Sequence, residues 1–314
     1  MNQRLLPLLA AAIAVAWPHA VVRADDANSP APFALAGIVH DAKASLGVVE
    51  RRKADPEAAV RTTDLTYKGG NGATVPADLQ VPAKPLGRKP AVILLHGLGG
   101  NRKQLGLLAT MLNGKGYVTL AIDAAGHGER PKFGANGPDS MSLEDMRTLG
   151  AQTVVDLRRA VDLLAGHPDV DPARIGYLGA SMGGILGARF YSDDPRVKAG
   201  VFLFAGGDWG KLLTTSQIGL AKSFRERGAT DAASVGKALA DIDPLYSIAR
   251  AAGRPILLIH GDKDDIVPVE CNELLFKAAK EPKERVLLPG GHVPDVLRWS
   301  SLSMAFLDKH LLKK

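Results

Sequence analysis

Short, almost purely apolar segments recur along the chain, and the segments between them favour helices. The apolar segments cover residues 91–95, 117–122, 175–178, 199–204, 255–259 and 285–288. Helices are predicted mainly over residues 142–166, 182–191, 269–280 and 293–312. Strands that are buried on both faces by crossover helices have this uninterrupted apolar composition. The pattern therefore predicts an α/β fold with a doubly wound, mostly parallel sheet.

The part of the chain that precedes this alternation has a different pattern. Residues 60–67 and 74–81 are predicted as two strands around the glycine-rich, turn-prone residues 69–72. Residues 25–55 are polar, rich in alanine and contain proline, and we expect a lead-in segment with one helix. Residues 56–314 show no internal repeat and are predicted to form one domain.

One insertion interrupts the alternation of strands and helices. The strands at 199–204 and 255–259 are separated by about 50 residues, far more than a usual connection. Residues 207–245 are predicted to form a small helical cap over the carboxyl edge of the sheet. Trp209, early in this segment, either lines a substrate pocket or packs the cap against the domain.

The first 24 residues have the pattern of a secretory signal peptide. Arg4 gives a basic start, residues 5–17 are almost wholly apolar, and small residues precede Asp25 at the spacing of a cleavage site. The alternative is a membrane anchor, but this apolar run is too short to span a bilayer comfortably. We expect cleavage before Asp25, no stable membrane insertion afterwards, and a periplasmic or secreted protein.

Charge and cysteine content exclude other classes of protein. Removal of residues 1–24 takes away Arg4 and Arg23 and lowers the net charge from +6 to +4. The basic residues are scattered among acidic ones, whereas a nucleic-acid partner would need a basic cluster. Cys271 is the only cysteine, so no internal disulfide forms. Its setting favours inert packing over a nucleophile.

The strongest chemical signal lies at the end of the third apolar segment. Residues 179–183 read Gly-Ala-Ser-Met-Gly, with an apolar strand before them and a predicted helix after them. This is the context of a nucleophile elbow, in which Ser181 sits on a sharp turn beside the helix N-terminus. Gly179 and Gly183 remove side chains that would collide with the neighbouring strand and helix.

A serine hydroxyl is a weak nucleophile until a histidine accepts its proton and an acid orients that histidine. Both partners follow Ser181 along the chain. The loop after the strand at 255–259 contains Asp262, Asp264 and Asp265, and the loop after the last strand contains His292. The order serine, acid, histidine is that of the α/β-hydrolase fold.

With these motifs, residues 56–314 resemble the α/β-hydrolase superfamily, and within it the dienelactone-hydrolase-like and prolyl-oligopeptidase-like esterases. Those families carry G-x-S-M-G-G at the nucleophile and G-x-x-D-x-x-V-P at the acid. The resemblance implies Asp264 as the acid, with Asp262 and Asp265 as alternatives. True dienelactone hydrolases use a cysteine nucleophile where this chain has Ser181, which argues against cyclic dienelactones as substrates.

The resemblance also implies an oxyanion hole made by the backbone amides of Leu98 and Met182. Leu98 lies in the glycine-rich loop 96–100, for which a plain tight turn is the alternative. The loop 123–128 resembles the D-x-x-G-H-G loop that shapes the site in such hydrolases without being catalytic. His96, His127 and His260 are expected to hydrogen-bond around the site. No pattern supports a metal ligand or a cofactor.

These motifs predict an exported serine hydrolase that cleaves small carboxylic esters through an acyl-enzyme intermediate. The alternatives are a prolyl-oligopeptidase-like peptidase and a catalytically silent binding protein of the same fold. Such peptidases usually carry a large β-propeller, and too few residues precede the first predicted strands to form one. The cap also carries Lys211, Lys222, Arg225 and Arg227, which raises the hypothesis that the acyl group is medium-sized and that the ester is acidic. The oligomeric state is not predicted.

Overall fold

The computed structural model describes residues 33–53, 55–131 and 140–312. In these ranges the strands are β1 (Phe33–Leu35), β2 (Ile38–His40), β3 (Val49–Arg52), β4 (Val60–Lys68), β5 (Thr74–Pro82), β6 (Lys89–Leu95), β7 (Val118–Ile122), β8 (Val170–Ala180), β9 (Val197–Leu203), β10 (Ile256–Gly261) and β11 (Lys283–Leu288). The helices are α1 (Gly106–Gly114), α2 (Leu143–Gly166), α3 (Met182–Asp193), α4 (Trp209–Thr215), α5 (Gly219–Glu226), α6 (Ala232–Ala238), α7 (Val269–Ala278) and α8 (Val296–Leu307).

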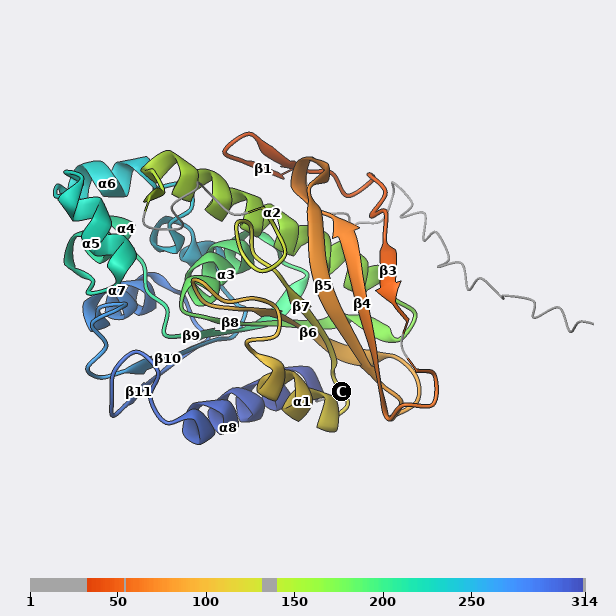
Figure 1. The fold of residues 1–314 in the computed structure, drawn as a ribbon. Coiled ribbons are helices and arrows are strands. Elements are labelled where there is room, and N and C mark those ends of the chain that lie inside the picture. Colours follow the sequence, from red (N-terminus) through yellow and green to blue (C-terminus); the bar gives the residue numbers. More distant parts are fainter. Residues whose placement is uncertain (1–32, 54, 132–139, 313–314) are drawn as a thin grey trace, which may run out of the picture.

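One large sheet organises the described part of the chain. Its nine strands lie in the order β11-β10-β9-β8-β6-β7-β5-β4-β3. The strands from β7 to β11 run parallel to their neighbours, whereas β5, β4 and β3 extend the sheet in antiparallel fashion. This confirms the predicted α/β fold with a mostly parallel sheet. Figure 1 shows β3, β4 and β5 at one end of the molecule and the helices α4, α5 and α6 at the other.

The central strands are apolar along their whole length because both faces of the sheet are covered. In β6, Ile93 and Leu95 belong to one core cluster, while Val92 and Leu94 belong to the other. Helices α2 and α3 pack on the first face, and α1 and α8 on the second (Figure 1). Side chains that alternate across a strand thus enter two separate cores.

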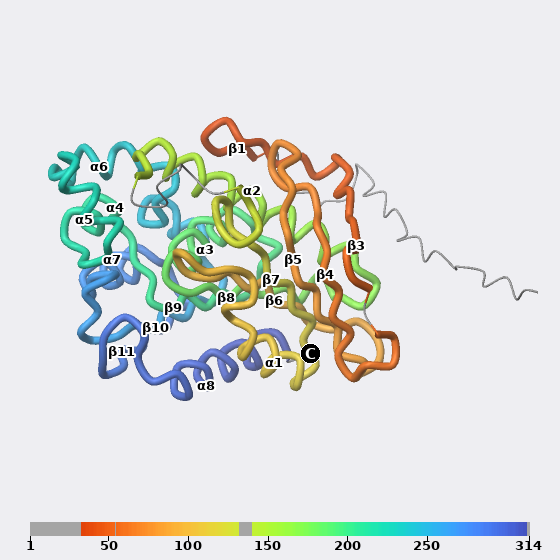
Figure 2. Tube along the Cα trace, in the orientation of Figure 1, coloured from red at the N-terminus to blue at the C-terminus, as the bar shows by residue number. Residues whose placement is uncertain are grey.

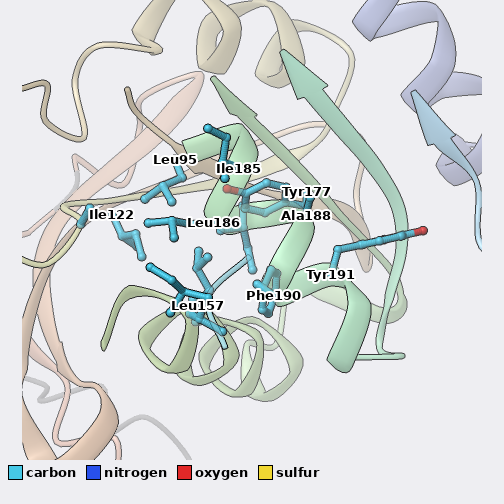
Figure 3. Packing of buried hydrophobic residues seen from close by; sticks show 14 of the residues in the cluster. Leu95, Ile122, Leu157, Tyr177, Ile185, Leu186, Ala188, Phe190 and Tyr191 are labelled. Atoms are coloured by element: carbon cyan, nitrogen blue, oxygen red, sulfur yellow. The ribbon is translucent and has the colours of Figure 1, made fainter. Parts of the chain in front are cut away.

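The first core holds α3 against the strand that precedes it. Tyr177 on β8 packs edge-on against Phe190 of α3, with ring centroids 5.6 Å apart. Figure 3 shows Ile185 and Leu186 of α3 on the same side of the sheet as Leu95. The short β8–α3 connection therefore has a rigid strand before it and a firmly packed helix after it.

The described part of the lead-in segment contains no helix, although one was expected somewhere in residues 25–55. The described part of residues 25–55 contains instead the β1–β2 hairpin and β3, which pairs with β4. The hairpin packs on α2, where the guanidinium of Arg158 lies 4.4 Å from the ring centroid of Phe33. Residues 1–24, the predicted signal peptide, lie outside the described residues.

Three short helices, α4, α5 and α6, occupy the segment predicted as a cap, and Figure 2 shows their chain passing beside the end of the sheet. Gly210 on α4 lies so close to the carbonyl of Ala232 that a side chain would overlap with it. The cap is therefore packed tightly within itself. None of the helices in the described part of the chain is both long and apolar enough to span a membrane.

Candidate active site

Ser181 occupies the turn between β8 and α3 in a strained backbone conformation. Its φ is +54° and its ψ is −119°, a region that residues other than glycine rarely adopt. A Cβ atom on Gly183 would lie 2.6 Å from the carbonyl oxygen of His96 and closer still to that of Leu95. The glycine is therefore required by the close passage of β6, as the sequence pattern predicted. The Ser181 amide donates to the carbonyl of Leu203 at 2.8 Å, which fixes the turn.

Three side chains from distant loops form a continuous hydrogen-bonded series. Nε2 of His292 lies 2.8 Å from Oγ of Ser181, and Nδ1 of His292 lies 2.8 Å from Oδ2 of Asp264. The carboxylate of Asp264 accepts a hydrogen bond from Nδ1–H of His292. Nε2 of the neutral ring therefore carries no hydrogen, and its lone pair faces the serine hydroxyl. Such an arrangement positions His292 to take a proton from Ser181.

The structure distinguishes among the three candidate acids. Asp264 is buried, and its Oδ1 accepts the amides of Ile266 and Val267 at 2.9 and 3.0 Å. Asp262 and Asp265 are exposed, and neither contacts His292. Oδ1 of Asp262 instead accepts the amide of Gly290 at 2.9 Å. Of the three, only Asp264 faces the histidine.

The loops that carry Asp264 and His292 meet because Gly261 has no side chain. A Cβ atom at this position would lie 2.7 Å from the carbonyl oxygen of Gly290 and would overlap with that of Gly291. The ends of β10 and β11 can therefore approach closely, and the residues after each strand come within hydrogen-bond distance of each other.

His260 also contacts the acid. Its Nε2 donates to the carbonyl of Val267 at 2.8 Å and lies 3.2 Å from Oδ2 of Asp264. The side chain is completely buried, and burial lowers its pKa, so the ring is neutral. The structure thus places His260 among the groups that hydrogen-bond around the site, as predicted, and shows that it stabilises the loop of Asp264.

Phe204, which the sequence analysis did not single out, packs against the ring of His292. The two rings meet edge-on with centroids 5.7 Å apart, and Phe204 makes a second edge-on contact with Trp299 of α8. Phe204 follows β9 with a φ of +55°. A positive φ at a bulky residue leaves no signal in the sequence, so this contact could not be foreseen.

The loop that contains Leu98 passes directly beside Ser181. A Cβ atom on Gly97 would lie 3.4 Å from Cβ of Ser181. Nδ1 of His96 donates to the carbonyl of Gly97 at 2.8 Å, and Nε2 accepts the amide of Ala124 at 3.1 Å. Burial lowers the pKa of His96 to about 4, so the ring keeps this neutral form.

The bond from His96 to Gly97 affects the neighbouring amide. The carbonyl of Gly97 and the N–H of Leu98 belong to one planar peptide group. Fixing the carbonyl on one side therefore fixes the direction of the N–H on the other. Leu98 and Met182 both line the cavity that Ser181 also lines. The oxyanion hole formed by their amides stays a prediction.

This cavity of about 70 Å³ lies between the main domain and the cap. Ser181, His127 and Thr153 contribute the polar side chains of its lining, and the rest is apolar. Trp209 lines it and is also buried against the core, so both predictions for this residue describe its position. The lining residues from the cap are Trp209, Leu212, Leu213, Ile218, Leu220 and Ile242.

The basic cap residues do not reach this cavity. Lys211, Lys222, Arg225 and Arg227 are all missing from its described lining. Arg225 donates to the carbonyls of Leu213 and Ser216, and Arg227 donates to that of Met141. Both side chains therefore tie the cap to its surroundings. These contacts account for Arg225 and Arg227, and the hypothesis of an acidic ester stays a prediction.

The loop 123–128 is held in place by charged groups beneath it. Asp123 is buried and accepts the guanidinium of Arg102 at 2.8 Å and the amide of Arg102 at 2.7 Å. Glu129 also pairs with Arg102, and its hydrogen bonds to Arg51 and Arg102 lower its pKa to about 2. The loop contributes Ala125 and His127 to the cavity, so it forms part of the wall.

Other reactive groups in the described residues lie apart from this site. No three His, Cys, Asp or Glu side chains there come together as metal ligands would. Cys271 is buried, and burial raises the pKa of its thiol to about 12. It therefore stays protonated and packs as an apolar side chain, as its sequence setting indicated.

Comparison with known proteins gives this geometry a context. An uncharacterized protein of Mycobacterium tuberculosis (strain ATCC 25618 / H37Rv), Rv2307c, is 32% identical over 209 residues, which are 66% of this chain and 64% of that protein. The uncharacterized peptidase YuxL of Bacillus subtilis (strain 168) is 28% identical over 225 residues, or 69% of this chain and 33% of YuxL. The chain thus spans less than two thirds of the length of either relative.

Solved structures share the architecture. An acetyl xylan esterase from Paenibacillus sp. R4 superposes with a TM-score of 0.72 at 23% identity, over 85% of this chain and 90% of that chain. At this identity the likeness shows a common fold. The family model described as the prolyl oligopeptidase family matches residues 104–289, more than half of the sequence. The resemblance to α/β-hydrolases is therefore confirmed, and the chain belongs to the prolyl oligopeptidase family within that fold.

Proposed function

We propose that the protein is a serine hydrolase that cleaves carboxylic esters through an acyl-enzyme intermediate. One observation carries this proposal: the series Ser181, His292 and Asp264 is hydrogen-bonded from end to end and opens onto an apolar cavity. A binding protein that had lost its activity would have no reason to keep Ser181 strained and bonded to a histidine.

Acylation follows from this geometry. Oγ of Ser181 attacks the carbonyl carbon of the ester while Nε2 of His292 takes the hydroxyl proton. Asp264 accepts a hydrogen bond from Nδ1–H of His292 and stabilises the imidazolium that forms. The carbonyl oxygen becomes an oxyanion, to which the amides of Leu98 and Met182 donate. Collapse of the tetrahedral intermediate breaks the bond to the alcohol oxygen, which receives the proton from His292.

Deacylation repeats the sequence with water as the nucleophile. His292 removes a proton from the water, which attacks the acyl carbon on Ser181. The second tetrahedral intermediate collapses when His292 returns the proton to Oγ of Ser181. The products of this step are a carboxylic acid and the free enzyme, and water is the only co-reactant.

A peptidase is the second candidate, because of the family match and because the relative YuxL is described as an uncharacterized peptidase. The cavity argues against it. The acyl half of a peptide carries amide N–H and C=O groups, and each one buried without a partner costs about 1–3 kcal/mol. Thr153 and His127 are the polar side chains beside Ser181 in the described lining. A hydrocarbon acyl group matches this surface better.

Export is part of the proposal. Its support is the charge and hydropathy pattern of residues 1–24 and the small residues before Asp25. The intact mass of the protein recovered from its native host tests this: a chain that begins at Asp25 supports export, and one that still begins at Met1 contradicts it.

The activity is tested with p-nitrophenyl esters and peptide p-nitroanilides, using the wild type and Ser181→Ala. We expect ester hydrolysis by the wild type, loss of that activity in the variant, and little cleavage of the anilides. Thermal unfolding of both proteins shows that the variant is folded. Cleavage of anilides but not of esters by the wild type would contradict the esterase proposal and support a peptidase.

A further inference from the structure

The cavity lies on one definite side of the reacting serine. Its lining includes Ser181, Leu98 and Met182, and it does not include His292. An ester bound to Ser181 must place its carbonyl oxygen at the two amides and its alcohol oxygen within reach of His292. The remaining substituent of the carbonyl carbon, the acyl chain, then points away from His292. The cavity is therefore on the acyl side.

A close contact between α2 and the cap narrows the cavity. Gly150 lies in the middle of α2, where glycine destabilises a helix by about 0.5–1 kcal/mol relative to alanine. A Cβ atom there would lie 2.8 Å from Cδ1 of Ile242, and both residues line the cavity. The glycine leaves room for Ile242, so these two residues set how far the cavity extends.

The volume of the cavity limits the chain that fits. An apolar cavity of about 150 Å³ accommodates benzene, which has six carbon atoms. A cavity of about 70 Å³ therefore holds about three carbon atoms of a linear acyl chain beyond its carbonyl carbon. The apolar lining favours a hydrocarbon.

The side of His292 is open by comparison. Val293 and Leu297, which follow the histidine, expose 61% and 77% of their surface. Val296 is exposed as well. Exposed side chains thus follow the histidine, and we expect the alcohol to extend into solvent.

We propose that the cavity is an acyl-binding pocket that selects short hydrocarbon acyl groups with about three carbon atoms beyond the carbonyl, that the contact between Ile242 and Gly150 sets this limit, and that the alcohol is not selected. The proposal rests on ester hydrolysis as the function. In this proposal the enzyme recognises the acyl chain of the ester, and Ile242 and Gly150 determine the chain length that fits.

The test compares kcat/KM for p-nitrophenyl esters from acetate to decanoate in the wild type, Ile242→Val and Ile248→Val. Ile242→Val removes the methyl group nearest Gly150. Ile248 is equally buried but lies outside the cavity lining, so Ile248→Val is a matched control. We expect a wild-type optimum near butanoate. The decanoate-to-butanoate ratio should rise about tenfold in Ile242→Val, the lower end of the effect of one methylene in a pocket, and stay at the wild-type value in Ile248→Val.

Two further measurements complete the test. Gly150→Ala narrows the pocket and should move the optimum to shorter chains. Ethyl and hexyl butanoate, followed by proton release, should have similar kcat/KM because only the alcohol differs. Equal ratios in Ile242→Val and Ile248→Val, with esters still hydrolysed, would overturn the pocket proposal and leave the function intact. A folded wild type that hydrolyses no ester would overturn both.

Discussion

Oγ of Ser181 and Nε2 of His292 lie 2.8 Å apart, although 111 positions separate the two residues in the sequence. The serine is presented by the β8–α3 turn, and the histidine by the loop after β11. Phe204 packs against the histidine ring, and Asp264 accepts its other nitrogen. The proton acceptor is therefore held in place before any substrate binds, which lowers the reorganisation needed during the reaction.

Asp264→Asn should lower kcat by about 10⁴-fold, because the amide no longer fixes the tautomer of His292 that accepts the serine proton. The measurement is steady-state hydrolysis of p-nitrophenyl butanoate. Asp265→Asn is the matched control, since this exposed carboxylate does not contact His292. A comparable loss in Asp265→Asn, or wild-type activity in Asp264→Asn, would show that Asp264 is not the acid.

His96→Leu should lower kcat with little change in KM, because the peptide between Gly97 and Leu98 loses the donor that orients it. The upper limit is the loss of one oxyanion donor, about 10²–10³ in rate. His96→Gln retains a donor group and should recover part of the activity. If Leu and Gln at this position behaved alike and raised KM only, His96 would have no role in orienting the amide of Leu98.

The protein should lose stability as the pH is lowered from about 6.5 to about 4. Burial lowers the pKa of His96 to about 4, and it also lowers those of His167 and His260. In this range the unfolded chain binds protons that the folded chain excludes, so the free energy of unfolding decreases as the pH is lowered. The contribution of His96 to this decrease levels off below about pH 4. The shift of His96 corresponds to about 3 kcal/mol at most.

Urea unfolding at several pH values measures this dependence. The slope between pH 6.5 and 4, the unfolded and folded pKa values of His96, should be shallower in His96→Gln than in the wild type. A slope that is the same in both proteins would mean that His96 titrates in the folded state as it does in a free peptide.

Gly183→Ala should destabilise the protein by about 3 kcal/mol or more, because the new methyl group meets backbone carbonyls of β6 and of the residue after it, which cannot move aside. Gly106→Ala is the matched control, since a Cβ atom there meets nothing within 4 Å. It should change the stability by less than about 1 kcal/mol. Thermal unfolding of the two variants gives the comparison, and similar melting temperatures would contradict the steric account of the turn.

Much of the candidate site was predictable because parallel strands end at a common edge of the sheet. Ser181, Asp264 and His292 each follow an apolar strand, so their order along the chain already indicated a shared location. The choice among Asp262, Asp264 and Asp265 was harder, because adjacent loop residues differ only in the direction of their side chains. In the structure the side chain of Asp264, and not that of Asp262 or Asp265, contacts His292.

Other features depend on contacts that no local pattern records. Each strand of the β1–β2 hairpin has three residues, too few to show a periodicity, and its position depends on α2. The basic residues of the cap suggested a charged pocket, yet none of them is among its described lining, and Arg225 and Arg227 donate to backbone carbonyls instead. The motifs of the candidate catalytic residues could thus be located from the sequence, whereas the shape and polarity of the pocket could be seen only in the packed structure.

Covalent labelling with a p-nitrophenyl alkylphosphonate tests the central claim, that His292 activates Ser181, most directly. Such a probe reacts only with an activated hydroxyl and mimics the tetrahedral intermediate. We predict one adduct per chain by intact mass, located on Ser181 by peptide mapping, absent in Ser181→Ala and formed far more slowly in His292→Asn. A folded wild type that forms no adduct, or one labelled equally fast without His292, would contradict the account.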